Sequence, residues 1–263
     1  MQKFILLIVI LLLSTHTFAS RELALKYAPV IYQGLGANPE ADEFTRFDFD
    51  GDWNPDNNWD NMPKFKRPRV VYWDVMESEN HYFITYAFFF PRDYASWCFW
   101  IHCHENDFEG ARVTVKKPST VTKLESLAHN FKSEVLNPAA IEITIEKEGH
   151  GIHPLPLRKP DEKFRKYTPS DYELISLDEL WKRRDTQVFT GSFNYKDKSY
   201  PANFGGSKWI LFGLGAAKPP WSWEIWRSDI EKGQWYLDPL KGTSEKYLKQ
   251  MTEGNMEVAQ DKN

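Results

Sequence analysis

The stretch HYFITYAFFF, residues 81–90, decides the fold class of this chain. It is rich in aromatic and β-branched residues, which favour β-strands. Both sets of alternating positions are largely apolar, beginning with Tyr82 on one set and Phe83 on the other. Since side chains alternate across a strand, both faces of this strand should be covered. We therefore expect a central strand of a sheet that is packed on both sides.

Three other stretches have the composition of strands. Residues 70–74 (VVYWD) precede the central strand, and residues 108–116 and 140–147 follow it. The last two alternate apolar and polar residues, which predicts one face in the core and one toward water. Shorter strands are expected at residues 187–193, 209–211 and 235–237.

Two further stretches repeat apolar residues at the spacing of a helix. The first comprises Leu124, Leu127, Ala128, Phe131 and Val135. The second lies in residues 171–184 and comprises Leu174, Leu177, Leu180 and Trp181, with Asp171 placed to cap its start. Together these patterns predict a mainly β protein, an antiparallel β-sandwich with one to three short helices.

The composition is that of a soluble globular protein, and the length suffices for a sizeable core. The chain has 263 residues, of which 41% are hydrophobic and 27% charged, with a net charge of −4. No excess of basic residues argues for nucleic acid as a partner. We expect a single domain over residues 20–263, with a polar tail that frays from about residue 242. The 11 Trp residues predict either aromatic core packing or display to a ligand.

The first 19 residues have the pattern of a secretory signal peptide. Lys3 is followed by an apolar run over residues 4–13, and Thr17 and Ala19 occupy the small-residue positions before a cut at Ser20. The run is shorter than the roughly 20 residues that span a bilayer. A buried strand or a short anchor is the alternative. We expect a secreted or periplasmic protein with no transmembrane segment after removal of residues 1–19.

The chain has two cysteines, Cys98 and Cys103. An exported protein meets an oxidising compartment, where a disulfide is stable. An internal disulfide would join these two residues and close a very short loop before His104. Two free thiols are the alternative.

An acidic cluster with histidines follows the central strand. Asp93 closes that strand, and His104, Asp107 and Glu109 lie on the approach to the next one. Side-chain alternation directs Asp107 and Glu109 to the same face. Oxygen ligands with one nitrogen suit Mg²⁺, Ca²⁺ or Mn²⁺ better than structural Zn²⁺. The cluster predicts a divalent-cation site, and a solvated acidic loop is the alternative.

The second candidate element is GHGIHP, residues 149–154, directly after an apolar strand. Gly149 and Gly151 permit a sharp turn and close approach to a ligand. His150 and His153 could reach the acidic cluster if the two strand ends are neighbours, and histidine serves as a ligand or as a general acid or base. A tight turn with two exposed histidines is the alternative.

Several motifs resemble those of two related families. Residues 86–93 (YAFFFPRD) and 104–109 (HENDFE) are similar to the Tyr-x-Trp-Tyr-x-Pro-Lys-Asp stretch and the His-x-x-Asp-Trp-Glu centre of necrosis- and ethylene-inducing (NPP1, or NLP) proteins. Residues 27–32 (YAPVIY) and 141–154 resemble the opening and the strand plus Gly-His turn of the Vps62-like family. The resemblance covers about residues 24–154, with a weaker echo at residues 219–223 and 235–239.

The NLP resemblance implies a secreted β-sandwich with a divalent cation in an acidic cavity. Such proteins bind sugar headgroups of membrane sphingolipids and damage plant cells. The residues that match their cation ligands are Asp93, His104, Asp107 and Glu109. Two positions depart from the heptapeptide: Phe108 replaces its Trp, and Asn106 replaces its second His.

Three functions follow as hypotheses. The first is a secreted protein that binds a glycan or lipid headgroup at the cation site, with Trp221 and Trp223 stacking on the ligand. The second is a metal-dependent hydrolase in which His150 or His153 moves the proton. The third is an NLP-like membrane-damaging toxin. Alternatively, the cation would have only a structural role and would connect loops. The sequence leaves open whether the protein is an enzyme.

Overall fold

The computed structural model describes residues 20–53, 57–77, 80–93, 104–128, 131–160, 163–177, 192–195 and 198–201. Several sequence predictions fall outside these ranges. They are the signal peptide, the Cys98–Cys103 disulfide, the Trp221 and Trp223 ligand contacts, the strands at 209–211 and 235–237, and the tail from residue 242.

The described part of the chain is mainly β, as predicted. Its strands are β1 (Val30–Gly34), β2 (Val70–Glu77), β3 (His81–Asp93), β4 (His104–Lys116), β5 (Thr120–Ala128), β6 (Phe131–Leu136), β7 (Glu142–Ile145), β8 (Ile152–Pro154), β9 (Phe164–Tyr167), β10 (Glu173–Ser176), β11 (Ser192–Tyr195) and β12 (Lys198–Pro201). The strands expected at residues 70–74, 81–90, 108–116 and 140–147 correspond to β2, β3, β4 and β7.

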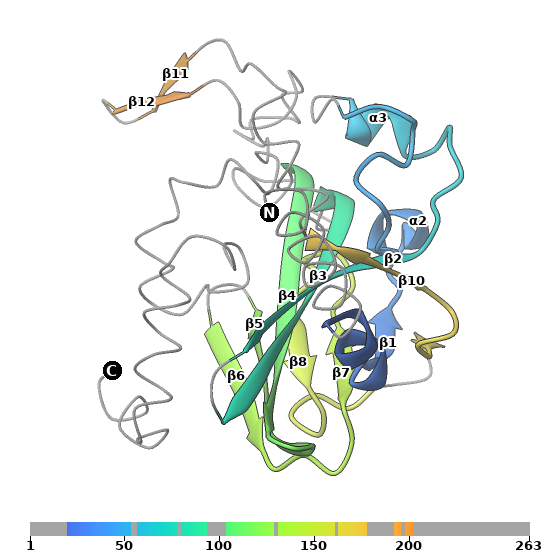
Figure 1. Cartoon of the computed structure of the whole chain (residues 1–263). Helices are drawn as coiled ribbons and strands as arrows, with labels where there is room; N and C mark the ends of the chain where they lie inside the picture. The colour runs from blue at the N-terminus through green and yellow to red at the C-terminus, as the bar shows by residue number, and fades with distance from the viewer. Residues whose placement is uncertain are drawn as a thin grey trace, which may run out of the picture.

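Two packed sheets form the sandwich (Figure 1). The larger has the strand order β10-β2-β3-β4-β5-β6, and the smaller has the order β8-β7-β1-β9. The predicted β-sandwich is confirmed, but its two sheets are mixed and not antiparallel throughout, because β1 pairs with β7 in parallel and β10 pairs with β2 in parallel. Both parallel pairs join strands that are distant in sequence, so no local turn signal could reveal them. A separate hairpin of β11 and β12 overlaps the strand expected at residues 187–193.

The main core lies between the two sheets. The smaller sheet contributes Ile31, Ile143 and Ile145, all fully buried. The larger sheet contributes alternate residues of β3, such as Tyr86 and Phe88, with others from β2, β4 and β5. The first set of alternating apolar positions in residues 81–90 therefore faces the core between the two sheets.

The other set of β3 positions is covered on the outer side of the larger sheet. Phe89 and Ala87 pack in a second cluster with residues of the connection that leads from β1 to β2. That connection contains two short helices, α2 (Pro39–Asp42) and α3 (Asn58–Asn61). The prediction that β3 is covered on both sides is confirmed, since every residue from Phe83 to Phe90 is buried.

The helix expected around residues 124–135 is wrong. This stretch forms the hairpin of β5 and β6, which pair in antiparallel. In its register Leu124 pairs with Val135 and Ala128 pairs with Phe131. These four positions share one face of the hairpin and are also spaced as on one face of a helix, so the apolar pattern does not distinguish the two structures.

The helix expected over residues 171–184 is wrong for residues 173–176, which form β10 beside β2; Leu177 is helical, and residues 178–184 lie outside the described ranges. Asp171 does not cap a helix, and its carboxylate instead accepts hydrogen bonds from the backbone N–H and hydroxyl of Thr168 at 2.7 Å each. Other helical residues of the described ranges lie in α2, α3 and residues 20–26. Within the described ranges, the structure contains no helix of the length and hydropathy needed to span a membrane.

Candidate functional site

The ends of β3 and β4 bring the predicted acidic residues onto one antiparallel ladder. Asp93 pairs with His104, at the outer end of the two strands. Further in, Asp107 pairs with Phe90 and Glu109 pairs with Phe88. Phe88 and Phe90 both belong to the inner core, which places Asp107 and Glu109 on the same face of β4, as predicted.

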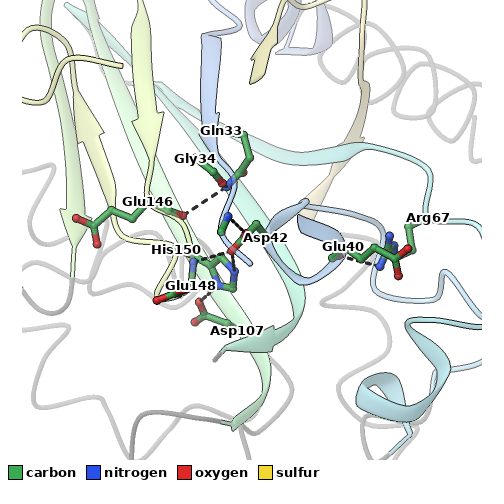
Figure 2. A network of polar contacts seen from close by, with 10 residues as sticks. Gln33, Gly34, Glu40, Asp42, Arg67, Asp107, Glu146, Glu148 and His150 are labelled. Carbon is green, nitrogen blue, oxygen red and sulfur yellow. Dashed lines mark hydrogen bonds and ion pairs between the residues drawn. The ribbon is translucent and has the colours of Figure 1, made fainter. Parts of the chain in front are cut away.

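His150 reaches this ladder from the turn between β7 and β8. Its Nδ1–H donates a hydrogen bond to Oδ2 of Asp107 at 2.9 Å, and the ring is fully buried (Figure 2). The backbone N–H of Phe108 donates to the other oxygen of Asp107 at 2.8 Å. Both carboxylate oxygens of Asp107 are therefore held by donors, and the expectation that His150 could meet the acidic cluster is confirmed.

The imidazole of His150 is fixed by the core on one side. It stacks in parallel on Phe90, with the ring centroids 3.8 Å apart and the planes at 1°. The turn that carries it places Glu148 at φ 68° and His150 at φ 52°, both in the left-handed region. The sharp turn that we expected at Gly149 and Gly151 thus depends on two non-glycine residues. Left-handed backbone at a bulky residue persists only where its surroundings hold it.

Asp42, the last residue of α2, faces the other side of the histidine. Its Oδ1 lies 4.0 Å from Nε2 of His150, and both side chains are fully buried. Oδ1 accepts the backbone N–H of Glu148 and Oδ2 accepts that of Gly36, each at 2.6 Å. Burial raises the pKa of Asp42, and these two backbone hydrogen bonds oppose the rise. Figure 2 shows Asp42 and Asp107 on opposite sides of the His150 ring.

Helix α3 is tied to the same end of β3 and β4. The side-chain amide of Asn58 donates to Oδ1 of Asn106 at 2.6 Å, and both residues are buried. The guanidinium of Arg92 donates to the carbonyl of Trp59 at 2.7 Å and lies 4.5 Å from the centroid of its ring. The contacts place a half-buried tryptophan next to the strand end that bears Asp93.

His153, the second histidine of the motif, takes a different place. Its Nε2 is 3.1 Å from Oε1 of Glu146, which also pairs with Arg158. The imidazole is part-exposed, with 21% of its surface accessible, at the edge of the smaller sheet. His150 and His153 are therefore not one functional pair.

The predicted cation ligands fit a hard divalent ion in donor type. Three carboxylates and one imidazole on adjoining strands are the oxygen-rich set that Mg²⁺ and Ca²⁺ take. His104 and Asp107 are three residues apart on β4, and the ladder with β3 keeps its register between them, although Asn106 has φ 60°. The side chain of His104 is outside the described residues. Among the side chains that are described, no group of three or more His, Cys, Asp or Glu is arranged to hold a metal ion.

Sequence reasoning missed Asp42 and the stacking role of Phe90. Asp42 lies in the stretch Pro39-Glu-Ala-Asp-Glu43, which has no motif or periodicity that marks one acid as buried. Its partners Gly36 and Glu148 are 6 and 106 residues away. Only the pairing of β1 with β7, which is parallel and long-range, brings these segments together.

Comparison with known proteins gives structural neighbours. No protein-family model matches the chain, and no curated protein matches it. Its structural neighbours are necrosis- and ethylene-inducing proteins. One structure, titled "Toxin fold as basis for microbial attack and plant defense", is 14% identical over 81% of this chain and 90% of its own, with a TM-score of 0.39.

Two further neighbours have similar values. Necrosis and Ethylene inducing Protein 2, from the causal agent of cocoa's Witches Broom disease, is 16% identical over 59% of this chain and 73% of its own, with a TM-score of 0.38. The protein NLPPya in complex with glucosamine is 16% identical over 61% and 74%, with a TM-score of 0.36. At these values, the function of the chain has to be argued from its own residues.

Proposed function

We propose that this is a secreted protein that binds a glycan or lipid headgroup through a divalent cation at the joined ends of β3 and β4. The ligands would be Asp93, His104, Asp107 and Glu109, and the cation would be Mg²⁺ or Ca²⁺, with Mn²⁺ as a third candidate. The observation that carries the proposal is the buried Asp107, whose two oxygens are both oriented by donors while it faces a second buried carboxylate across His150.

Burial of acidic groups has a cost that must be offset. Moving an ionised carboxylate out of water is unfavourable unless it is paired or coordinates a metal. Asp107 is 5% exposed and Asp42 is fully buried, and the imidazole between them can balance at most one negative charge. A bound divalent cation would supply positive charge to this region and would attract the hydroxyl or phosphate oxygens of a headgroup.

The chain itself provides a rigid frame for such a site. Asp107 and Glu109 lie on β4, where they pair with Phe90 and Phe88 of β3, and β4 also pairs with β5 from Ala111 onward. Trp59 and Arg92 border the same strand end. An aromatic ring next to the proposed divalent cation would be a suitable surface for a sugar. The contacts proposed for Trp221 and Trp223 lie outside the described residues and remain predictions.

The geometry does not favour the hydrolase hypothesis. A general base must reach the proton that it removes, directly or through one water. The ring of His150 is fully buried against Phe90, and His153 is engaged with Glu146 at another edge. We therefore keep headgroup binding as the function and assign neither histidine a catalytic role.

A glycan and lipid array tests the proposal directly. Residues 20–263 would be applied in the presence of Ca²⁺ and Mg²⁺, and again with EDTA. We expect binding to a subset of sugar or phosphate headgroups that EDTA abolishes and that Asp107→Asn also abolishes. Binding that persists in EDTA would overturn the role of the cation.

The toxin hypothesis is decided by a separate assay. Dye-loaded vesicles made from a headgroup-positive glycolipid would be incubated with the protein and Ca²⁺. Release of the dye would add membrane damage to headgroup binding. Intact vesicles that nevertheless carry bound protein would show a binding protein without lytic activity.

A further inference from the structure

The buried histidine links two segments that are far apart in the sequence. Its Nδ1 contacts Asp107 of β4 at 2.9 Å, and its Nε2 lies 4.0 Å from Asp42 of α2. All three side chains are at least nine-tenths buried. Nε2 has no hydrogen-bond partner among the described atoms, which leaves Asp42 as the charged group that faces it.

The contact with His150 determines the orientation of Asp107. A carboxylate has about four acceptor positions, two on each oxygen. His150 uses one on Oδ2 and the backbone of Phe108 uses one on Oδ1. These two donors hold the carboxylate in one orientation.

Asp42 in turn holds the turn that carries His150. Its two oxygens accept N–H groups from Gly36 and Glu148, so the carboxylate joins the end of β1 to the turn after β7. Glu148 and His150 are both left-handed in that turn. The two hydrogen bonds and the stack on Phe90 are contacts that can maintain this strained backbone.

We infer that His150, braced by Asp42, is a positioning residue that sets Asp107 for cation binding. The inference rests on the proposed function, because it assigns a role within the same site. Partners that orient a metal ligand in this way commonly change metal affinity by about 10- to 100-fold when they are removed. Asp42 and His150 make no direct contact with the cation in this assignment.

Two substitutions at position 150 separate positioning from backbone strain. Glycine and asparagine both tolerate φ near 52°, so neither adds strain to the turn. His150→Asn retains a side-chain N–H donor close to the position of Nδ1, and His150→Gly removes it. We expect calorimetric titration with Mg²⁺ and Ca²⁺ to give a Kd about 10- to 100-fold weaker for His150→Gly. His150→Asn should recover most of that loss.

Addition of free imidazole provides a rescue that a purely structural role would not show. Imidazole can fill the space that His150→Gly leaves beside Phe90 and can donate to Asp107. We expect it to restore Ca²⁺ affinity to His150→Gly and to leave the affinity of the wild type unchanged. Imidazole binds Ca²⁺ weakly, because hard cations prefer oxygen ligands.

The metal-free protein provides an independent readout. In ¹⁵N-histidine NMR spectra, the signal that His150→Asn removes should be that of a ring with a protonated Nδ1, as its hydrogen bond to Asp107 requires. Asp107→Asn should shift this signal. A ring with an unprotonated Nδ1 would overturn the inference.

The outcomes distinguish this inference from the proposed function. A wild type that binds no divalent cation overturns both. A wild type that binds a cation, together with a His150→Gly variant of equal affinity, overturns only the positioning role. If His150→Gly does not fold, Asp42→Asn decides: we expect it to weaken cation binding, and unchanged affinity overturns the inference.

Discussion

Strand β4 contributes to two clusters of charged side chains, which differ in their balance of acidic and basic groups. In its middle, Arg112 pairs with Glu125 of β5, which also pairs with Lys123 at 2.7 Å. Glu125 lies opposite Glu134 on β6, so two cationic and two acidic side chains occupy neighbouring ladder positions. At the end of the strand, Asp107 and Asp42 face each other across one imidazole.

The comparison shows what separates a structural network from a candidate site. In the middle of β4 the formal charges of Arg112, Lys123, Glu125 and Glu134 sum to zero within the protein. At the end of β4, two carboxylates share a histidine that can carry at most one positive charge. A surplus of buried acid is the situation that a bound cation resolves.

The largest expected effect is a loss of stability when the ion pair of Arg112 with Glu125 is broken. Arg112→Met leaves Glu125 fully buried with one of its two cations removed. We expect the free energy of unfolding to fall by about 3–5 kcal/mol, the usual cost of breaking a buried ion pair. Urea denaturation followed by circular dichroism measures it. Arg112→Lys, which retains the charge, is the control and should lose less; an equal loss in both variants would count against the ion pair.

The next effect is the stability that a bound cation adds, which should depend on Asp107 and not on Arg112. At a free cation concentration of about 100 times Kd, binding to the folded state should add about 2.7 kcal/mol to the wild type. Arg112→Lys should keep this gain, because its substitution is in the other group. Asp107→Asn should lose it. Thermal melts with and without Ca²⁺ measure the three gains, and a retained gain in Asp107→Asn would remove the distinction between the two regions.

A smaller effect tests the irregular end of β4. Asn106 has φ 60°, a conformation that costs most residues about 1–2 kcal/mol. Asn106→Ala should destabilise the protein by about that amount relative to Asn106→Gly, since both variants lack the contact with Asn58 but only glycine avoids the backbone cost. Equal urea midpoints for the two variants would show that the left-handed backbone is not maintained.

The smallest effect is a pH dependence at Asp42. Burial raises its pKa above the usual 3.8, so the folded protein holds this proton more tightly than the unfolded chain does. Its contribution to stability is therefore fully present below about pH 3.8 and is lost as the pH rises through the raised pKa. The stability of the wild type relative to Asp42→Asn should decrease from acid to neutral pH. Urea titrations across this range measure it, and a difference that increases with pH would contradict the assignment.

The positions of the central strands could be predicted from the sequence, but the strands with which they pair could not. The alternation in residues 81–90 correctly predicted a strand covered on both faces, because each position reports its own environment. The helix expected near Leu124 is wrong because the apolar positions at helical spacing are partners across the β5–β6 hairpin, Leu124 with Val135 and Ala128 with Phe131. The parallel pairs of β1 with β7 and β10 with β2 leave no local signal.

The candidate site was likewise predictable only in part. Motif spacing indicates Asp107 and His150 as candidate site residues, and the two side chains are in contact. Asp42 was missed, since its burial depends on two backbone N–H groups supplied by other segments. The motif does not distinguish His150 from His153, yet they contact different partners, because the first lies in the turn after β7 and the second lies on β8.

The cation content of the protein tests the central claim most directly. Purified residues 20–263 and the Asp107→Asn variant would be equilibrated with Ca²⁺, Mg²⁺ and Mn²⁺, desalted and submitted to elemental analysis. We predict one divalent ion per chain in the wild type and its loss in Asp107→Asn. A wild type that retains no divalent ion after exposure to all three would contradict the account.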